Sequence, residues 1–267
     1  MIRDITIGQY YKADSVIHRL DPRVKLMGTL IFIISLFMGM NIWIYAVVTV
    51  ALAVVIKMSR IPLKFMVRGL KSIVILIIIS AVFNLFLTPG DVLIQIWKLT
   101  ITYQGLKMAI FMVVRLIYLI GGTSLMTLTT TPNNLTDGLE KGLGFLKVIK
   151  VPVHEIAMMM SIALRFIPIL IEETDKIMKA QMARGADFEN GSLIKRAKAM
   201  VPILVPLFVS AFRRANELAM AMEARCYHGS EGRTKMKPLK YEKRDRIAYI
   251  SMVLYLGVII IVKIIAA

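Results

Sequence analysis

The chain of 267 residues combines an apolar composition with a large excess of basic side chains. Hydrophobic residues make up 57% of it, the mean hydropathy is +0.70, and the formal net charge is +17. This combination excludes an ordinary soluble domain and is typical of a protein that spans a bilayer and keeps its Lys and Arg in cytoplasmic loops. Nucleic-acid binding is disfavoured, because no basic stretch alternates with stacking aromatic residues on a soluble module. A single cysteine, Cys226, excludes an internal disulfide and a cysteine-based zinc site.

Five apolar segments predict membrane-spanning helices. The uncharged run at 26–56 would be about 46 Å long as one helix, which exceeds a hydrocarbon core of roughly 30 Å. Gly39 begins a Gly-Met-Asn turn near the middle of this run and divides it. We therefore predict spans at 24–39, 42–57, 73–87, 105–128 and 247–266.

The distribution of Lys and Arg predicts the orientation of these spans. The N-terminal arm, the connector at 57–71 and the block at 129–246 are basic, whereas the loops near 40 and at 90–104 are poor in Lys and Arg. The positive-inside rule then places the N-terminus and the 129–246 block in the cytoplasm and the C-terminus outside. Trp97 and Tyr103 are expected to anchor the loop at 90–104 at the membrane–water interface.

The 129–246 block is longer than a connection between two spans requires, and its pattern is helical. A short helix is expected at 132–146, a long one at 152–184 and another long one at 192–225. Both long helices are apolar first and charged or amphipathic later, so we expect them to pack under the membrane bundle and present their charged ends to a cytoplasmic partner. The prediction is an all-α membrane protein with about five transmembrane helices and a cytoplasmic lobe of about three helices. Its segments are 1–128, 129–228 and 229–267.

A near-repeat marks the ends of the two long cytoplasmic helices. One copy reads Gln-Met-Ala-Arg-Gly and contains Arg184, and the other reads Met-Glu-Ala-Arg-Cys and contains Arg225. A single arginine at a helix C-terminus has a purely structural explanation, because it offsets the negative end of the macrodipole by about 0.3–1 kcal/mol. Two arginines in matched settings instead favour two similar sockets on a partner, where a guanidinium forms forked hydrogen bonds. The small neighbours are Ala183 and Gly185 in the first copy and Ala224 and Cys226 in the second.

Together with this repeat, motifs spread over nearly the whole chain resemble those of the T components (EcfT) of energy-coupling factor transporters, in the same order. The motifs are His18-Arg19-Leu20-Asp21-Pro22-Arg23-Val24-Lys25-Leu26, Leu135-Thr136-Asp137-Gly138-Leu139, Leu164-Arg165-Phe166-Ile167-Pro168 and the two Ala-Arg-small signatures. That family often has glycine where this chain has Cys226. Cysteine is also small, so docking is expected to persist.

The resemblance implies a non-catalytic membrane scaffold of an importer for vitamins or other micronutrients. Two coupling helices end in arginine motifs, and each motif docks in a groove of one of two ABC-type ATPase subunits, which form a heterodimer or a homodimer. A separate membrane subunit, the S component, binds the substrate. By resemblance, Arg184 and Arg225 are the coupling arginines. ATP and magnesium belong to the partner ATPases, no cofactor is bound directly, and the location is the bacterial cytoplasmic membrane.

The remaining candidate residues are expected to have structural or interface roles. Asp21 and Arg23 should cap and orient the first span, and Arg115 should snorkel or pair with polar groups inside the bundle. Arg165 and Pro168 match a family motif, and the flanks of Arg165 also suit a hydrogen bond between helices. A run of three acidic residues is expected to form a solvated helix face, balanced by nearby lysines. The residues are Glu172, Glu173 and Asp175, with Lys176 and Lys179.

A membrane enzyme or a channel would need sequence features that this chain lacks. The chain has no phosphate-binding Gly-x-x-x-x-Gly-Lys-Ser/Thr loop, no His-Glu-x-x-His and no Gly-x-Ser-x-Gly, which argues against a membrane enzyme, and no metal site is expected. A channel would need a polar lining, and the spans offer little beyond Asn84, Thr123 and Ser124. A T component dedicated to cobalt or nickel remains an alternative with the same fold. The sequence does not specify the transported substrate, or whether the module serves one S component or several. It also does not specify which arginine docks on which ATPase, the stoichiometry of the complex or the conformational mechanism.

Overall fold

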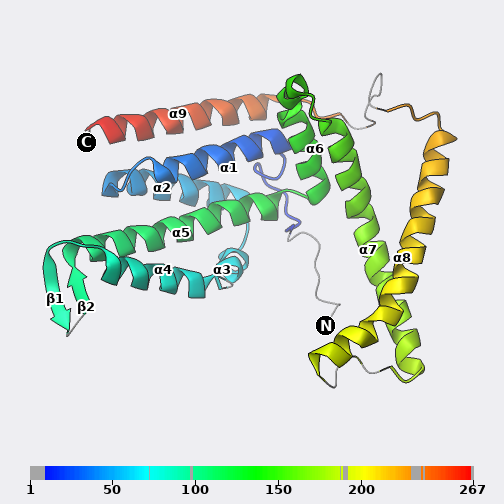
Figure 1. Cartoon of the computed structure of the whole chain (residues 1–267). Coiled ribbons are helices and arrows are strands. Elements are labelled where there is room, and N and C mark those ends of the chain that lie inside the picture. Colours follow the sequence, from blue (N-terminus) through cyan, green and yellow to red (C-terminus); the bar gives the residue numbers. More distant parts are fainter. Residues whose placement is uncertain are drawn as a thin grey trace. The chain divides into compact units, whose positions relative to one another are not determined.

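The computed structural model describes residues 10–71, 73–96, 99–186, 188, 192–229, 236 and 238–265, and most of them are helical (Figure 1). The chain divides into two compact units. Of the described residues, the bundle unit combines those up to Leu139 with those from Leu239 onward, and the α7–α8 unit holds those of Glu140–Pro238. The predicted boundaries at 128 and 228 concern position relative to a membrane and stay predictions.

The bundle unit contains seven of the described helices and a hairpin. Its elements are α1 (Pro22–Phe37), α2 (Ile42–Ser59), α3 (Leu63–Lys71), α4 (Val74–Leu87), β1 (Val92–Ile96), β2 (Leu99–Thr102), α5 (Tyr103–Thr129), α6 (Pro132–Gly142) and α9 (Lys243–Ile265). The α7–α8 unit contains the 3-10 helix η2 (Gly144–Ile149), α7 (Val153–Ala183) and α8 (Leu193–Glu223).

Helices α1, α2, α4, α5 and α9 of the bundle unit lie side by side (Figure 1). Helix α5 contacts α1, α3 and α4, while α9 contacts α1 and α2. One apolar core joins α1, α2 and α9, with Leu36, Val48 and Ile259 almost fully buried. The polar N-cap of α1, Asp21, and that of α2, Asn41, each accept a hydrogen bond from a backbone N–H of the first turn. The sequence thus marks where both helices begin.

Helix lengths confirm the predicted fold class and refine the list of spans. Among the described helices, α2, α5, α7 and α9 are long and apolar enough to cross a membrane, and the bent pair α3–α4 makes a fifth candidate. Helices α1 and α4 occupy two predicted spans, but their 16 and 14 residues rise only about 24 and 21 Å. By length and composition alone, α7 also qualifies, although the sequence pattern assigned it to the cytoplasmic lobe.

A short hairpin replaces the loop that was expected at 90–104. Strands β1 and β2 pair antiparallel, with Val92 opposite Thr102 and Ile96 opposite Leu99. The segment is rich in β-branched residues, which favour extended backbone, and it is too short for a buried helix. Tyr103 is exposed at the start of α5, while Trp97 lies outside the described residues.

Two of the motifs that carry the family resemblance pack directly against each other. A Cβ built on Gly138 of α6 would lie 2.8 Å from Cβ of Pro22 and 3.3 Å from the carbonyl carbon of Pro22. Real Cβ atoms essentially never approach another atom so closely, so only glycine allows α6 to lie against the start of α1 at this point. The glycine in the second motif is therefore explained by the proline in the first.

We predict that Gly138→Ala destabilises the bundle unit. The added methyl group overlaps Pro22, and overpacking of this kind typically costs about 1–3 kcal/mol. The thermal unfolding midpoint of the purified protein in detergent should fall. Gly142→Ala on the same helix is the matched control, because its Cβ would meet nothing within 4 Å. Equal midpoints for the two variants would contradict the packing explanation.

Candidate functional site

Two long helices carry the arginine repeat. Helices α7 and α8 have 31 residues each, so each rises about 46 Å. They contact each other, and their C-terminal ends lie at opposite ends of the pair (Figure 1). Arg184 therefore lies at one end of the α7–α8 unit and Arg225 at the other.

The end of α7 is a Schellman motif, in which two backbone hydrogen bonds close the last turn around a left-handed residue. Gly185 has φ +88°, its N–H donates to the carbonyl of Met182 at 2.9 Å, and the N–H of Ala186 donates to the carbonyl of Gln181 at 3.0 Å. Glycine suits this position because it adopts positive φ at little cost. Arg184 is the last residue before the chain turns away.

Helix α8 ends in the same way. Cys226 has φ +55°, its N–H donates to the carbonyl of Glu223 at 2.8 Å, and the N–H of Tyr227 donates to the carbonyl of Met222 at 3.1 Å. Arg225 thus occupies the backbone position that Arg184 occupies in α7. Sequence reasoning noted the small residues after the arginines but missed this geometry, for which the glycine after Arg184 is the recognisable signal.

Both arginines are available to a partner. Arg184 and Arg225 are exposed, and so are the neighbouring Ala183 and Ala224. Among the described residues, neither guanidinium has a hydrogen-bond or ion-pair partner, and each arginine uses only its backbone N–H, which closes the last turn of its helix. The turn after each arginine directs the following chain away, so the guanidinium, with its five N–H donors, stands at the tip of a rigid helix. Such a tip fits a concave groove lined with carboxylates or carbonyls.

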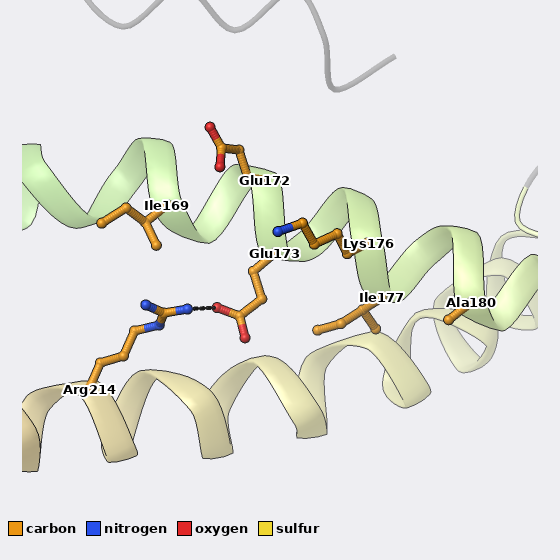
Figure 2. Close-up of a pocket in the computed structure, with 7 residues that line it drawn as sticks. All are labelled: Ile169, Glu172, Glu173, Lys176, Ile177, Ala180 and Arg214. Atoms are coloured by element: carbon orange, nitrogen blue, oxygen red, sulfur yellow. Dashed lines mark hydrogen bonds and ion pairs between the residues drawn. The ribbon is translucent and has the colours of Figure 1, made fainter.

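A polar cluster, rather than a solvated acidic face, lies where α7 meets α8 (Figure 2). Glu173 of α7 accepts a hydrogen bond from Oγ of Ser210 at 2.5 Å and pairs with Nη2 of Arg214 at 2.7 Å, both on α8. The expectation that lysines of the same helix balance Glu173 is therefore wrong for this residue, because the side chain points toward α8. The cluster borders a cavity of about 370 Å³ that is also lined by Ile169 and Lys176.

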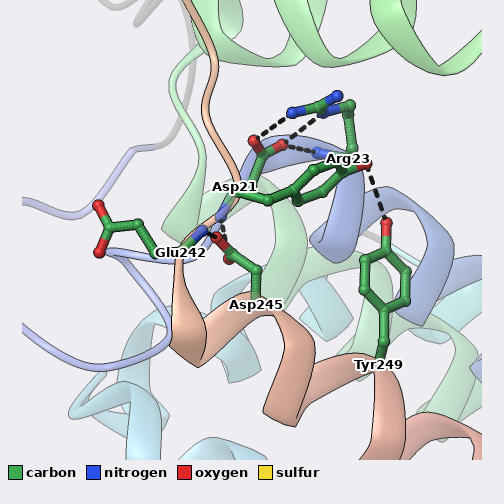
Figure 3. Close-up of polar contacts among 6 residues, drawn as sticks. Asp21, Arg23, Glu242, Asp245 and Tyr249 are labelled. Atoms are coloured by element: carbon green, nitrogen blue, oxygen red, sulfur yellow. Dashed lines mark hydrogen bonds and ion pairs between the residues drawn. The ribbon is translucent and has the colours of Figure 1, made fainter.

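In the bundle unit, Asp21 and Arg23 form part of a polar junction between α1 and α9 (Figure 3). Arg23 donates to both carboxylate oxygens of Asp21, at 3.0 and 2.9 Å, and its guanidinium lies over the ring of Tyr241 at 3.8 Å. Asp245, in the first turn of α9, accepts the backbone N–H groups of Asp21 and Glu242 at 2.9 and 2.8 Å. The motif thus ties the starts of α1 and α9 together.

Lys25 extends this junction to α5. Its ammonium donates to the carbonyl of Thr129 at 2.8 Å and to the carbonyl of His18 at 3.0 Å. Thr129 is the last residue of α5, so a cation offsets the negative end of that helix. The junction therefore holds the N-terminal arm and the ends of three helices.

The remaining candidate residues lie in different surroundings. Arg115 is buried in the bundle, where its Nε donates to Oη of Tyr45 at 3.0 Å and its guanidinium lies 5.0 Å from the ring centroid of Phe37. Arg165 and Pro168 are exposed on α7, and no hydrogen bond joins the guanidinium of Arg165 to another described residue. Within the described ranges, no three His, Cys, Asp or Glu side chains are placed to hold a metal ion.

The stabilising contribution of Asp21 is expected to disappear in acid. Burial alone would raise its pKa, but hydrogen bonds from Arg23 and the charges of Arg23 and Lys25 outweigh it and hold the pKa of Asp21 below its usual value. Because the pKa is lower in the folded protein, the contribution is present above about pH 4 and is lost as the pH falls through the folded pKa.

Thermal midpoints of the wild type and of Asp21→Asn, measured between pH 7 and pH 3, test this expectation. The wild type should be more stable at neutral pH, and the difference should shrink below about pH 4. A difference that stays constant over the whole range would show that the charge of Asp21 contributes nothing.

We predict opposite effects of two substitutions at the left-handed positions. Gly185→Ala should loosen the end of α7, since a left-handed conformation costs a residue with a Cβ about 1–2 kcal/mol. Cys226→Gly should relieve the same cost at the end of α8. Hydrogen exchange read by mass spectrometry should show faster exchange of the Ala186 amide in the first variant and slower exchange of the Tyr227 amide in the second. Cys226→Ala is the control and should leave exchange unchanged.

Comparison with known proteins assigns the family. The CbiQ family model, described as cobalt transport protein, matches residues 13–236. Proteins named energy-coupling factor transporter transmembrane protein EcfT are similar along nearly the whole chain. That of Clostridium kluyveri is 57% identical over 250 residues, 93% of each chain, and that of Thermosediminibacter oceani is 56% identical over 250 residues, 94% of each. That of Bacillus subtilis is 47% identical over 254 residues, 95% of this chain and 96% of the relative. The chain therefore belongs to the CbiQ/EcfT family, the non-catalytic, multi-pass transmembrane components of energy-coupling factor transporters.

Proposed function

We propose that the chain links two ABC-type ATPase subunits to a substrate-binding S component and transmits motion between them. The main support for this proposal is the position of two exposed arginines. Each directly precedes the left-handed residue that ends its helix, and the two lie at opposite ends of a pair of contacting helices. In this proposal Arg184 docks in a groove of one ATPase and Arg225 in the corresponding groove of the other. The ATPases form a heterodimer or a homodimer. The names of the relatives place those proteins in energy-coupling factor transporters, which agrees with this assignment.

The geometry of the tips suits this role. A guanidinium forms forked hydrogen bonds to carboxylates and carbonyls, and truncating one such buried group typically costs about 2–5 kcal/mol of binding. The exposed Ala183 and Ala224 leave room for the walls of a groove to approach the helix backbone. The chain itself binds no nucleotide, so ATP and magnesium act in the partners.

Motion is passed on through α7 and α8. When ATP binding or hydrolysis changes the distance between the two grooves, the tips are pulled with them and the helices tilt or slide. Both helices expose large apolar side chains, among them Met159, Met160, Phe208 and Phe212, which suit contact with a membrane subunit. The extent of the motion is limited by the differential affinity of the partners for the two arrangements.

The substrate is chosen by the S component, and we propose a vitamin or another micronutrient. A module dedicated to cobalt or nickel is the second candidate, favoured by the description of the matching family model. The chain lies in the bacterial cytoplasmic membrane, with the N-terminus and the 129–246 block in the cytoplasm and the C-terminus outside. The asymmetry of Lys and Arg supports this orientation.

Co-purification with the cognate ATPases tests the proposal. The double variant Arg184→Ala/Arg225→Ala should lose both ATPases at matched expression, because each docking contact loses its only guanidinium. Arg213→Ala is the matched control, since Arg213 is also an exposed arginine of α8 and its ion pair with Glu217 is long, at 4.0 Å. The control should retain the ATPases.

Each single arginine variant should weaken the recovery of one ATPase more than that of the other if the two are different proteins. Retention of both ATPases by the double variant would place docking elsewhere and refute the proposed role of the tips. Recovery of no ATPase with the wild type would refute the scaffold itself.

A further inference from the structure

Among the described residues, one ion pair joins α7 to α8, between Glu173 and Arg214. Glu173 uses both carboxylate oxygens, one with Ser210 and one with Arg214. The side chain of Glu173 is 20% exposed and that of Arg214 is 35% exposed, so both charged groups are partly buried. Nε of Arg214 is buried and has no acceptor among the described residues. A pair with these properties resists sliding more than an exposed pair does, because breaking it leaves partly buried charges uncompensated.

The same pair lies at equal distances from the two arginine tips. Eleven residues separate Glu173 from Arg184, and eleven separate Arg214 from Arg225. Both stretches are helical nearly to their ends, so each measures about 16 Å along its axis. The shift along the chain that superimposes Arg184 on Arg225 therefore also superimposes Glu173 on Arg214. The two helices contact each other at matching points of the repeat.

The charges near the Glu173–Arg214 pair are opposite in sign at positions that correspond by the same shift along the chain. Glu172 and Glu173 on α7 correspond by that shift to Arg213 and Arg214 on α8. The acidic pair and the basic pair thus occupy equivalent places on the two halves of the repeat, and one residue of each faces the other helix (Figure 2). A slip of one helical turn in either helix would separate Glu173 from Arg214 by about 5 Å. The pair therefore specifies one register of α7 against α8.

We propose that Glu173, Ser210 and Arg214 form a clasp that fixes the point at which α7 and α8 cross and so sets the separation of the two arginine tips. The three residues are positioning residues: they touch neither ATPase and act through the register of the helices. With the clasp closed, movement of one tip turns its helix about a fixed point and is passed to the other helix. With the clasp open, the helices slide past each other and the movement is lost. The inference rests on the proposed function for its role in transport, but not for the geometry of the helix pair.

Distance measurement between the two helices tests the clasp directly. Nitroxide labels at Lys179→Cys and Met220→Cys, both exposed and equivalent in the repeat, report the separation of the tip regions. Cys226→Gly serves as the cysteine-free background, since glycine accommodates the left-handed turn there. Pulsed electron spin resonance is recorded on the full chain in lipid nanodiscs, with and without the ATPases.

The clasp predicts one narrow distance distribution in the background protein and in the control Glu217→Gln, which alters only an exposed pair on α8. Glu173→Arg, which places like charges at the crossing point, should broaden the distribution and shift its maximum. The charge swap Glu173→Arg/Arg214→Glu should restore the narrow distribution, and with it the substrate uptake that Glu173→Arg loses. An unchanged distribution in Glu173→Arg overturns the proposal.

The swap also covers the case in which Glu173→Arg fails to fold. Recovery of folded protein in the double variant supports the clasp, whereas a double variant no better than the single one overturns it. The proposed function is tested separately by ATPase co-purification with the same proteins. Normal docking with an unaltered distance distribution refutes the clasp alone, and absent docking with a charge-dependent distribution refutes the coupling role alone.

Discussion

The left-handed residue after each arginine is the constraint on which the presentation of both arginines depends. An α-helix that continued past Arg184 or Arg225 would place the guanidinium on its side, among other side chains. The turn at Gly185 and Cys226 instead closes the last carbonyls and sends the chain away. The arginine is thereby left at the end of a long helix, with its neighbours small and exposed. The same device used twice gives two equivalent tips on one chain.

The arginine tips keep their positions only if the helices keep their arrangement. Polar contacts contribute to this because they join specific atoms of neighbouring helices, whereas apolar contact does not select one arrangement. In a bilayer the tails of lipids are as apolar as leucine, so apolar contact alone selects an arrangement of helices poorly. Asp245 and Lys25 join the ends of α1, α5 and α9 in the bundle unit. Glu173 and Arg214 join α7 to α8 in the other unit. In each unit, a few buried or partly buried charged groups thus join specific points of neighbouring helices.

The sequence predicts the positions of most helices well, although it assigned the residues of α3 to a connector, and it predicts the contacts between helices poorly. Uncharged runs and polar caps such as Asp21 locate helices within a few residues of their observed ends, because these signals are local. The hairpin at 92–102 was missed, since its strands have only five and four residues and the segment was expected to be a loop. The close approach of Gly138 to Pro22 and the pairing of Glu173 with Arg214 join residues far apart in the chain. Such pairs become visible only when the packing is known.

The most direct test of the coupling account is a cryo-electron microscopy structure of the chain bound to its cognate ATPases and an S component. The account predicts that the guanidinium of Arg184 lies within hydrogen-bond distance of acceptors in a groove of one ATPase, and that of Arg225 within the equivalent groove of the other. Both left-handed turns should persist in the complex. A structure in which either guanidinium faces lipid or water, with the ATPases held by other parts of the chain, would contradict the account.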